Sequence, residues 1–171
     1  MEKILYYPEF ITGTILNWQN LLKPQKYKHM ILENLQHMVS ANKITLYSYC
    51  IMDNHIHLIW QIKGDVNVSH VKRSFFTRTA QCFKSDLKKH HPKVLPHFKS
   101  SQGDRNYHFW ERRSLGIDLF TDKVFEQKFN YIHQNPVAAG LCTFEEGYPY
   151  SSALFYRTRE DPWNMLTHYR E

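Results

Sequence analysis

Two adjacent strand-like segments, residues 43–51 and 55–62, constrain the fold of this chain most. Both are rich in β-branched and aromatic residues, and the turn-forming pair Asp53-Asn54 separates them, so the sequence predicts a β-hairpin. Successive side chains of a strand point to opposite faces. In the second segment three large apolar side chains fall on one face, where we expect the core: Ile56, Leu58 and Trp60.

The segments around this hairpin complete the order of elements. Residues 10–18 predict a strand, and apolar residues at helical spacing predict an amphipathic helix over 25–41 and a longer one over about 68–90. A further strand with a polar middle is expected over 107–119. The order strand–helix–strand–strand–helix–strand predicts an α+β, ferredoxin-like βαββαβ fold with an antiparallel sheet.

One additional helix follows this unit. Thr121 or Asp122 is suited to cap its start, and Pro136 is expected to end it, which makes Asn135 its last helical residue. In a ferredoxin-like fold the first two helices cover one face of the sheet. We therefore expect the additional C-terminal helix to lie across the other face.

Composition narrows the class of protein. The 171 residues are expected to form one domain, with about 142–171 as an extension packed on it. A count of 22 Lys and Arg against 16 Asp and Glu gives a net charge of +6, which suits a polyanionic partner without requiring one.

The three cysteines form no CxxC pair, which argues against a disulfide framework or a thiolate zinc site. Without a signal pattern, or an apolar run near the ~18–20 residues that span a membrane, we expect a cytoplasmic protein with no membrane partner.

A His-x-His step and a Tyr-x-x-x-Asn pair are the candidate functional residues. His55 and His57 share one face of a predicted strand, opposite the expected core. Tyr131 and Asn135 lie four residues apart and share one face of the last predicted helix. Two imidazoles and an amide oxygen are able to hold a divalent metal, and a tyrosine hydroxyl is able to attack a phosphate. The predicted topology brings both pairs to the open face of the sheet.

Each of these residues also has a structural interpretation. A His-x-His step on a strand is more often structural than metal-binding, and a tyrosine near a helix end is more often a half-buried aromatic. The pair Asn135-Pro136 is by default a helix stop. His133 is interpreted as a packing residue or a support for the site, and Ser151 or Ser152 as the cap of a short helix.

Four stretches carry a family resemblance: MDNHIHLI at 52–59, FWERR at 109–113, YIHQNPVAAGL at 131–141 and YPYSS at 148–152. Together they resemble the single-tyrosine HUH transposases of the IS200-like insertion-sequence type, and most closely the REP-associated tyrosine transposase branch. The third stretch is the most specific, whereas a His-x-His step alone is a weak signal. Many relatives have a basic, glycine-containing start to the first strand, which this chain lacks.

The resemblance implies a ferredoxin-like fold with an additional C-terminal helix that carries Tyr131. It implies that His55, His57 and Asn135 bind a divalent metal, Mg²⁺ or Mn²⁺, and that Tyr131 is the nucleophile. The implied activity is metal-dependent cleavage and strand transfer of single-stranded DNA, beside a DNA hairpin, through a 5′-phosphotyrosine. Homodimers and monomers both occur among the relatives, so both stay open for this chain.

Basic side chains outside the predicted core are candidate DNA contacts: Lys72, Arg73, Arg78 and Lys84 on the longer helix, and Arg112 and Arg113 as phosphate clamps. An ordinary solvated surface is the alternative for the helix. The aromatics of the following segment are either base-stacking residues or core residues: Tyr107, Phe109 and Trp110.

Two further functions compete with a DNA strand-transferase. The first is a domesticated, non-cleaving protein that binds DNA hairpins, which predicts hairpin affinity without a covalent adduct. The second is a metal hydrolase acting on small phosphoesters, whose activity would persist without Tyr131.

Overall fold

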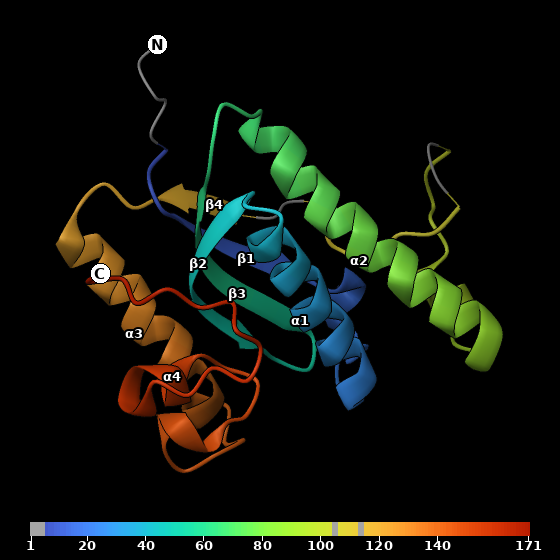
Figure 1. Cartoon of the computed structure of the whole chain (residues 1–171). Helices are drawn as coiled ribbons and strands as arrows, with labels where there is room; N and C mark the ends of the chain where they lie inside the picture. The colour runs from blue at the N-terminus through green and yellow to red at the C-terminus, as the bar shows by residue number, and fades with distance from the viewer. Residues whose placement is uncertain (1–5, 104–105, 113–114) are drawn as a thin grey trace.

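The computed structural model describes residues 6–103, 106–112 and 115–171. Its strands are β1 (Glu9–Thr14), β2 (Ile44–Ile51), β3 (His55–Ile62) and β4 (Leu115–Asp118). Its three long helices are α1 (Gln25–Ser40), α2 (Val68–His90) and α3 (Asp122–Ala138). The strands form one antiparallel sheet in the order β2-β3-β1-β4 (Figure 1). This order confirms the predicted α+β, ferredoxin-like fold.

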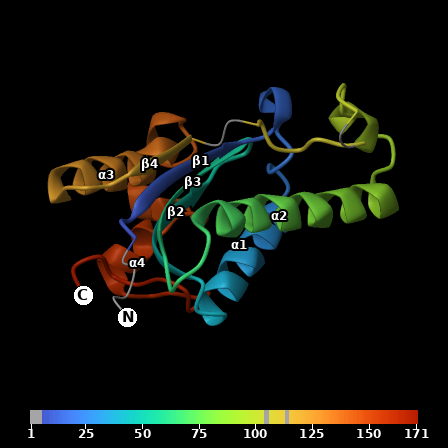
Figure 2. The ribbon, with the colours of Figure 1, turned by 90° about the horizontal axis from the view of Figure 1, so that it is seen from above.

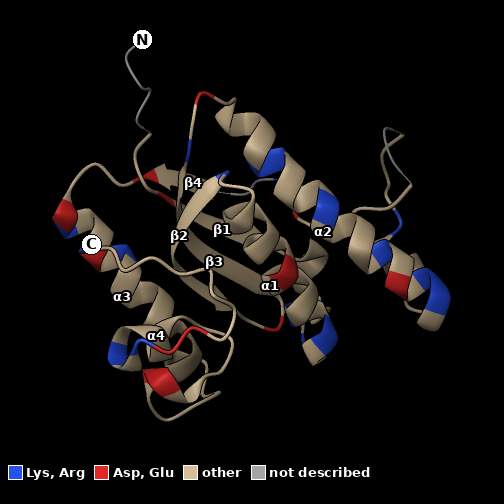
Figure 3. Cartoon of the chain, in the orientation of Figure 1, with Lys and Arg blue, Asp and Glu red and all other residues tan. Residues whose placement is uncertain are grey.

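The sheet separates two layers of helices. Helices α1 and α2 pack on one face and α3 on the other (Figure 2). Ile56, Leu58 and Trp60 are fully buried on the α1–α2 side, as their alternation predicts. Ile59 is fully buried on the opposite side, where it packs with Ile132 of α3. Lys and Arg residues occur along α2 (Figure 3).

Two predicted strands are shorter in the structure. The first ends at Thr14, and a 3-10 turn, η1 (Leu16–Trp18), follows it, because Asn17 and Trp18 both have a φ of 55°, outside the extended region. Among the described residues of the strand expected over 107–119, only β4 is regular strand. Phe109 and Trp110, which are consecutive, are both buried, and this breaks the alternation that a strand with one buried face needs. Both aromatics are therefore core residues and not base-stacking residues.

The prediction that Pro136 ends the last helix is wrong, because α3 continues to Ala138. Proline removes one helical N–H donor, yet the following donors are satisfied: Ala139 N–H bonds to the carbonyl of Asn135 at 3.0 Å. The helix ends instead just before Gly140, whose φ of 72° is the left-handed conformation common after a helix. Asn135 therefore lies inside a helical turn.

The C-terminal segment packs along the outer edge of β2. It contains a 3-10 turn, η3 (Glu145–Gly147), and a short helix, α4 (Ala153–Thr158). Thr167 N–H bonds to the carbonyl of Leu46 at 2.9 Å, and Ile51 N–H bonds to the carbonyl of Tyr150 at 2.9 Å. Backbone groups that an edge strand would otherwise present to solvent are thus used by the chain itself. None of the described helices is both long and apolar enough to cross a membrane.

Candidate active site

The two imidazoles lie side by side on the face of β3 that α3 covers. Their ring centroids are 4.9 Å apart. His55 Nδ1 lies 2.7 Å from Asn54 Oδ1, and His57 Nδ1 lies 3.0 Å from Thr12 Oγ1. The Thr12 contact follows from the sheet register, because Thr12 of β1 is the direct partner of His57. Both rings are thus held through Nδ1 by side-chain oxygens.

Helix α3 brings Tyr131 and Asn135 to the same place. The Tyr131 ring lies 5.1 Å from the His57 ring and 6.1 Å from that of Phe10. Asn135, one turn later, hydrogen-bonds His55. Tyr131 remains 49% exposed, so its ring covers the imidazoles while solvent or a ligand still reaches it. The structure therefore places all four candidate residues in one cluster within a single chain.

Burial keeps both imidazoles neutral. The pKa of His57 is lowered to about 3 by burial first, then by repulsion from His55 when that ring is protonated, and by the charge of Lys128. Burial also lowers the pKa of His55, and the hydrogen bond to Asn135 opposes this. Neutral imidazole is the form that binds a metal.

The donor set fits a divalent cation. His57 Nε2 is buried and has no hydrogen-bond partner among the described residues, a state that costs roughly 1–3 kcal/mol. A cation bound there would satisfy this nitrogen, with Nδ1 of the same ring already held by Thr12. In the part of the chain that the structure describes, no group of three His, Cys, Asp or Glu side chains could hold a metal. A third protein ligand therefore has to be of another type, and the amide of Asn135 is adjacent to His55.

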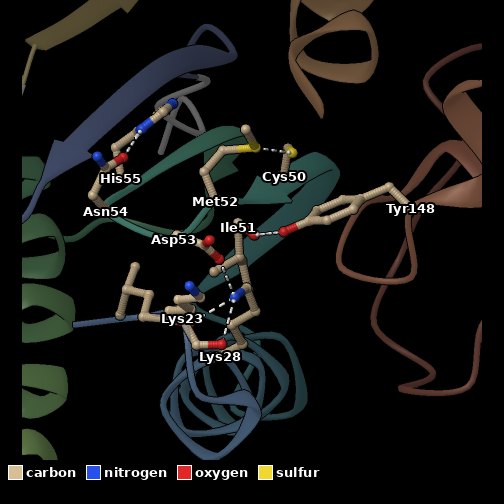
Figure 4. A network of polar contacts seen from close by, with 10 residues as sticks. Lys23, Lys28, Cys50, Ile51, Met52, Asp53, Asn54, His55 and Tyr148 are labelled. Atoms are coloured by element: carbon tan, nitrogen blue, oxygen red, sulfur yellow. Dashed lines mark hydrogen bonds and ion pairs between the residues drawn. The ribbon is translucent and has the colours of Figure 1, made fainter. Parts of the chain in front are cut away.

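The turn before His55 is fixed by a buried lysine (Figure 4). Lys28 of α1 is 3% exposed, and its Nζ donates to the carbonyl of Leu22 at 2.7 Å and to Asp53 Oδ1 at 2.8 Å. On the other side of the hairpin, Tyr148 Oη donates to the carbonyl of Ile51 at 2.7 Å. These contacts set the position from which β3 presents its first histidine.

Lys28→Met should lower the free energy of unfolding by about 2–3 kcal/mol, because it leaves buried carbonyls and the Asp53 carboxylate without their donor. Chemical denaturation measures the change. Lys23→Met is the matched control, since it removes the same charge from an exposed side chain and should change stability by less than about 0.5 kcal/mol. Equal losses for the two variants would contradict the bracing role of Lys28.

The predicted basic residues divide among three surfaces. Lys72 forms an ion pair with Glu9 beside β4. Arg73, Lys84 and Arg112 line a groove of about 800 Å³ between α2 and residues 106–112. Arg78 lies in a different hollow beside α1. Arg113 falls outside the described residues. Of the candidate DNA contacts that the structure describes, only Arg73, Lys84 and Arg112 therefore share one surface.

A second buried network joins α3 to the sheet. His133 is 3% exposed, and its Nε2 lies 2.7 Å from Ser152 Oγ and 3.2 Å from Ser48 Oγ of β2. His133 is therefore a packing residue, as interpreted from the sequence. Ser152 makes no side-chain cap bond to α4, because its hydroxyl is used in this network, whereas Ser151 Oγ accepts from Ala153 N–H.

Several residues of the site escaped the sequence analysis. The position of Thr12 beside His57 follows only from the register between β1 and β3. Lys128 lies one turn before Tyr131 on α3, with its Nζ 5.9 Å from the center of the Tyr131 ring. Their spacing of three residues in the sequence would have predicted that the two side chains share one face of the helix. Trp18 has its ring 5.8 Å from that of His55, and nothing local to the sequence places it there.

Comparison with known proteins gives a family and a fold. The family model described as "Transposase IS200 like" matches residues 16–135, a range that contains all four clustered residues. No curated protein matches the chain. A solved structure described as a REP-associated tyrosine transposase bound to a REP hairpin is 16% identical with a TM-score of 0.65, over 98% of this chain and 89% of that one. A crystal structure from Deinococcus radiodurans R1, described as a candidate transposase, is 14% identical with a TM-score of 0.46, over 77% of this chain and 90% of that one.

Proposed function

Because this chain belongs to the IS200-like transposase family, we propose that its four-residue cluster cleaves and rejoins single-stranded DNA through a covalent tyrosine intermediate. One observation carries the proposal: the phenol ring of Tyr131 lies 5.1 Å from the ring of His57, whose buried Nε2 has no hydrogen-bond partner among the described residues. A nucleophile beside a neutral, unsatisfied metal ligand suits phosphoryl transfer.

His55, His57 and Asn135 would hold a divalent cation, Mg²⁺ or Mn²⁺. When bound, the cation supplies charge neutralisation and orientation of the target phosphate. Thr12 and Asn54 hold the two imidazoles through Nδ1, so the rings do not have to reorient when they bind it. Lys128 adds positive charge over the Tyr131 ring, in the region that an anionic phosphate would enter.

Tyr131 Oη would attack the phosphorus of a DNA phosphodiester. A bond forms between Oη and phosphorus, and the bond from phosphorus to the 3′ oxygen breaks. The phenol proton passes to solvent, and the departing 3′ oxygen takes up a proton to become a 3′-OH. One phosphodiester replaces another, so the same 3′-OH, or that of a second strand, is able to reverse the step and join DNA. All the groups in this account come from one chain.

A labelling experiment tests this chemistry and its polarity. A DNA hairpin with a single-stranded flank, incubated with Mn²⁺, should give a protein–DNA adduct that survives a denaturing gel. A 3′ label should migrate with the protein, while a 5′ label should be released on a shorter strand with a free 3′-OH. The reverse pattern would refute the proposed polarity. Hairpin affinity with no adduct would identify a domesticated, non-cleaving hairpin-binding protein instead.

A further inference from the structure

An exposed tryptophan lies directly beside the proposed metal ligands. Trp18 of η1 is 62% exposed, although tryptophan is one of the most apolar side chains. Its ring centroid lies 5.8 Å from that of His55, at an interplanar angle of 66°. Ring contacts therefore run without a break from Tyr131 to His57, from His57 to His55, and from His55 to Trp18.

The backbone of Trp18 is held firmly against the site. Trp18 N–H bonds to the carbonyl of Ile15 at 2.9 Å, and Asn54 Nδ2 donates to the carbonyl of Trp18 at 3.3 Å. The same Asn54 side chain contacts His55 through its Oδ1, so one amide connects the tryptophan to the first imidazole. Asn17 N–H donates to Glu111 Oε1 at 2.7 Å, which ties the turn to the segment beyond α2.

The Trp18 backbone is strained, and its ring belongs to neither described hydrophobic cluster. Asn17 and Trp18 both have a φ of 55°, a left-handed conformation that asparagine tolerates but that is strained for a bulky residue such as tryptophan. The turn contains no buried residue, and of its side chains Leu16 packs, partly buried, against the core, whereas Trp18 does not. A strained backbone that holds an apolar ring in solvent destabilises the fold. Binding of a ligand to the ring explains this arrangement better than packing does.

An unpaired nucleobase is the ligand that this ring fits. Aromatic side chains stack on bases of single-stranded DNA, and a paired base inside a duplex has both faces covered by its neighbours. A strand whose target phosphate lies between Tyr131 and the imidazoles has a neighbouring nucleotide within reach of the next ring in the series. Resting on the proposed function, we propose that Trp18 stacks on an unpaired base next to the phosphate that is cleaved and so selects single-stranded DNA.

The test compares oligothymidylate with an abasic strand of the same length, because the two differ in bases and not in phosphates. Binding is measured by fluorescence anisotropy at fixed salt with Mn²⁺, in the non-cleaving Tyr131→Phe background. Trp18→Ala should weaken binding to oligothymidylate by about 5- to 150-fold, the range of ~1–3 kcal/mol per stacked base, and should leave binding to the abasic strand unchanged. Equal losses on the two strands, or no loss on either, would overturn the proposal.

Three further variants control for misfolding and for non-specific effects. Trp18→Leu keeps an apolar side chain without a ring and should behave like Trp18→Ala, whereas Trp18→Phe should retain most of the affinity. Phe144→Ala, at an aromatic residue that is also 62% exposed but lies beyond α3, should bind both strands like the parent. If Trp18→Leu keeps full preference for oligothymidylate, stacking by Trp18 is refuted.

The outcome is separable from that of the proposed function. If the unsubstituted chain forms the covalent adduct with a hairpin while the Trp18 variants keep their preference for bases, only the stacking proposal fails. If no adduct forms but Trp18→Ala loses that preference, the cleavage proposal fails and the base-binding site stands.

Discussion

Tyr131→Phe should reduce formation of the covalent protein–DNA adduct by at least ~10³-fold, because the substitution removes the only atom that forms the new bond to phosphorus in the proposed reaction. The ring and its contacts with His57 and Phe10 are retained. DNA affinity should therefore change little. The measurement is the yield of adduct over time on a denaturing gel, beside the affinity for the same uncleaved oligonucleotide.

The control for this variant is Tyr7→Phe, at a tyrosine that is 57% exposed and lies before β1. It should form adduct at the parent rate. Both variants should unfold within about 0.5 kcal/mol of the parent, since neither loses a buried group. Undiminished adduct from Tyr131→Phe would assign the nucleophile to another residue.

His57→Phe should abolish both the adduct and the stabilisation of the fold by Mn²⁺. A ligand at 100 times its Kd adds about 2.7 kcal/mol to the stability of a fold that binds it, which is roughly 5–10 °C in Tm for a chain of this size. The rings of His57 and Phe10 are stacked with their centroids 5.5 Å apart. Phenylalanine at position 57 keeps this contact and removes the unsatisfied Nε2. Without metal, the variant should be about as stable as the parent.

Thermal unfolding with and without Mn²⁺ measures this prediction directly and does not depend on the DNA sequence recognised. His70→Phe, on an exposed position of α2, is the matched control and should keep the full shift in Tm. If His57→Phe shows the same Mn²⁺-dependent shift as the parent, the metal does not bind at this imidazole.

Local patterns predicted the elements that position the site. The segments over 55–62 and 68–90 match β3 and α2 at both ends, because alternation in the first and helical spacing in the second continue until a turn interrupts them. The shared face of His55 and His57 follows from the same alternation. The resemblance to IS200-like transposases is confirmed by the family match, which spans the cluster.

Predictions failed where long-range contacts decide the structure. The ion pair between Lys72 and Glu9 and the location of Arg78 away from the groove depend on how α2 packs, which a helical wheel does not contain; that these two residues contact DNA stays a prediction. The strand expected over 10–18 turns at η1, because Asn54 and Glu111, both distant in sequence, bond to its backbone. Trp18 was assigned to that strand because these two distant contacts cannot be read from the local sequence.

The C-terminal segment that hydrogen-bonds along β2 has a consequence for self-association. A second copy of the chain could not extend the sheet by adding its own strand at β2, because Leu46 and Ile51 already bond to the tail of the same molecule. Any pairing of two molecules that left this tail in place would have to use other surfaces. The C-terminal segment thus prevents edge-to-edge polymerisation of the sheet at β2.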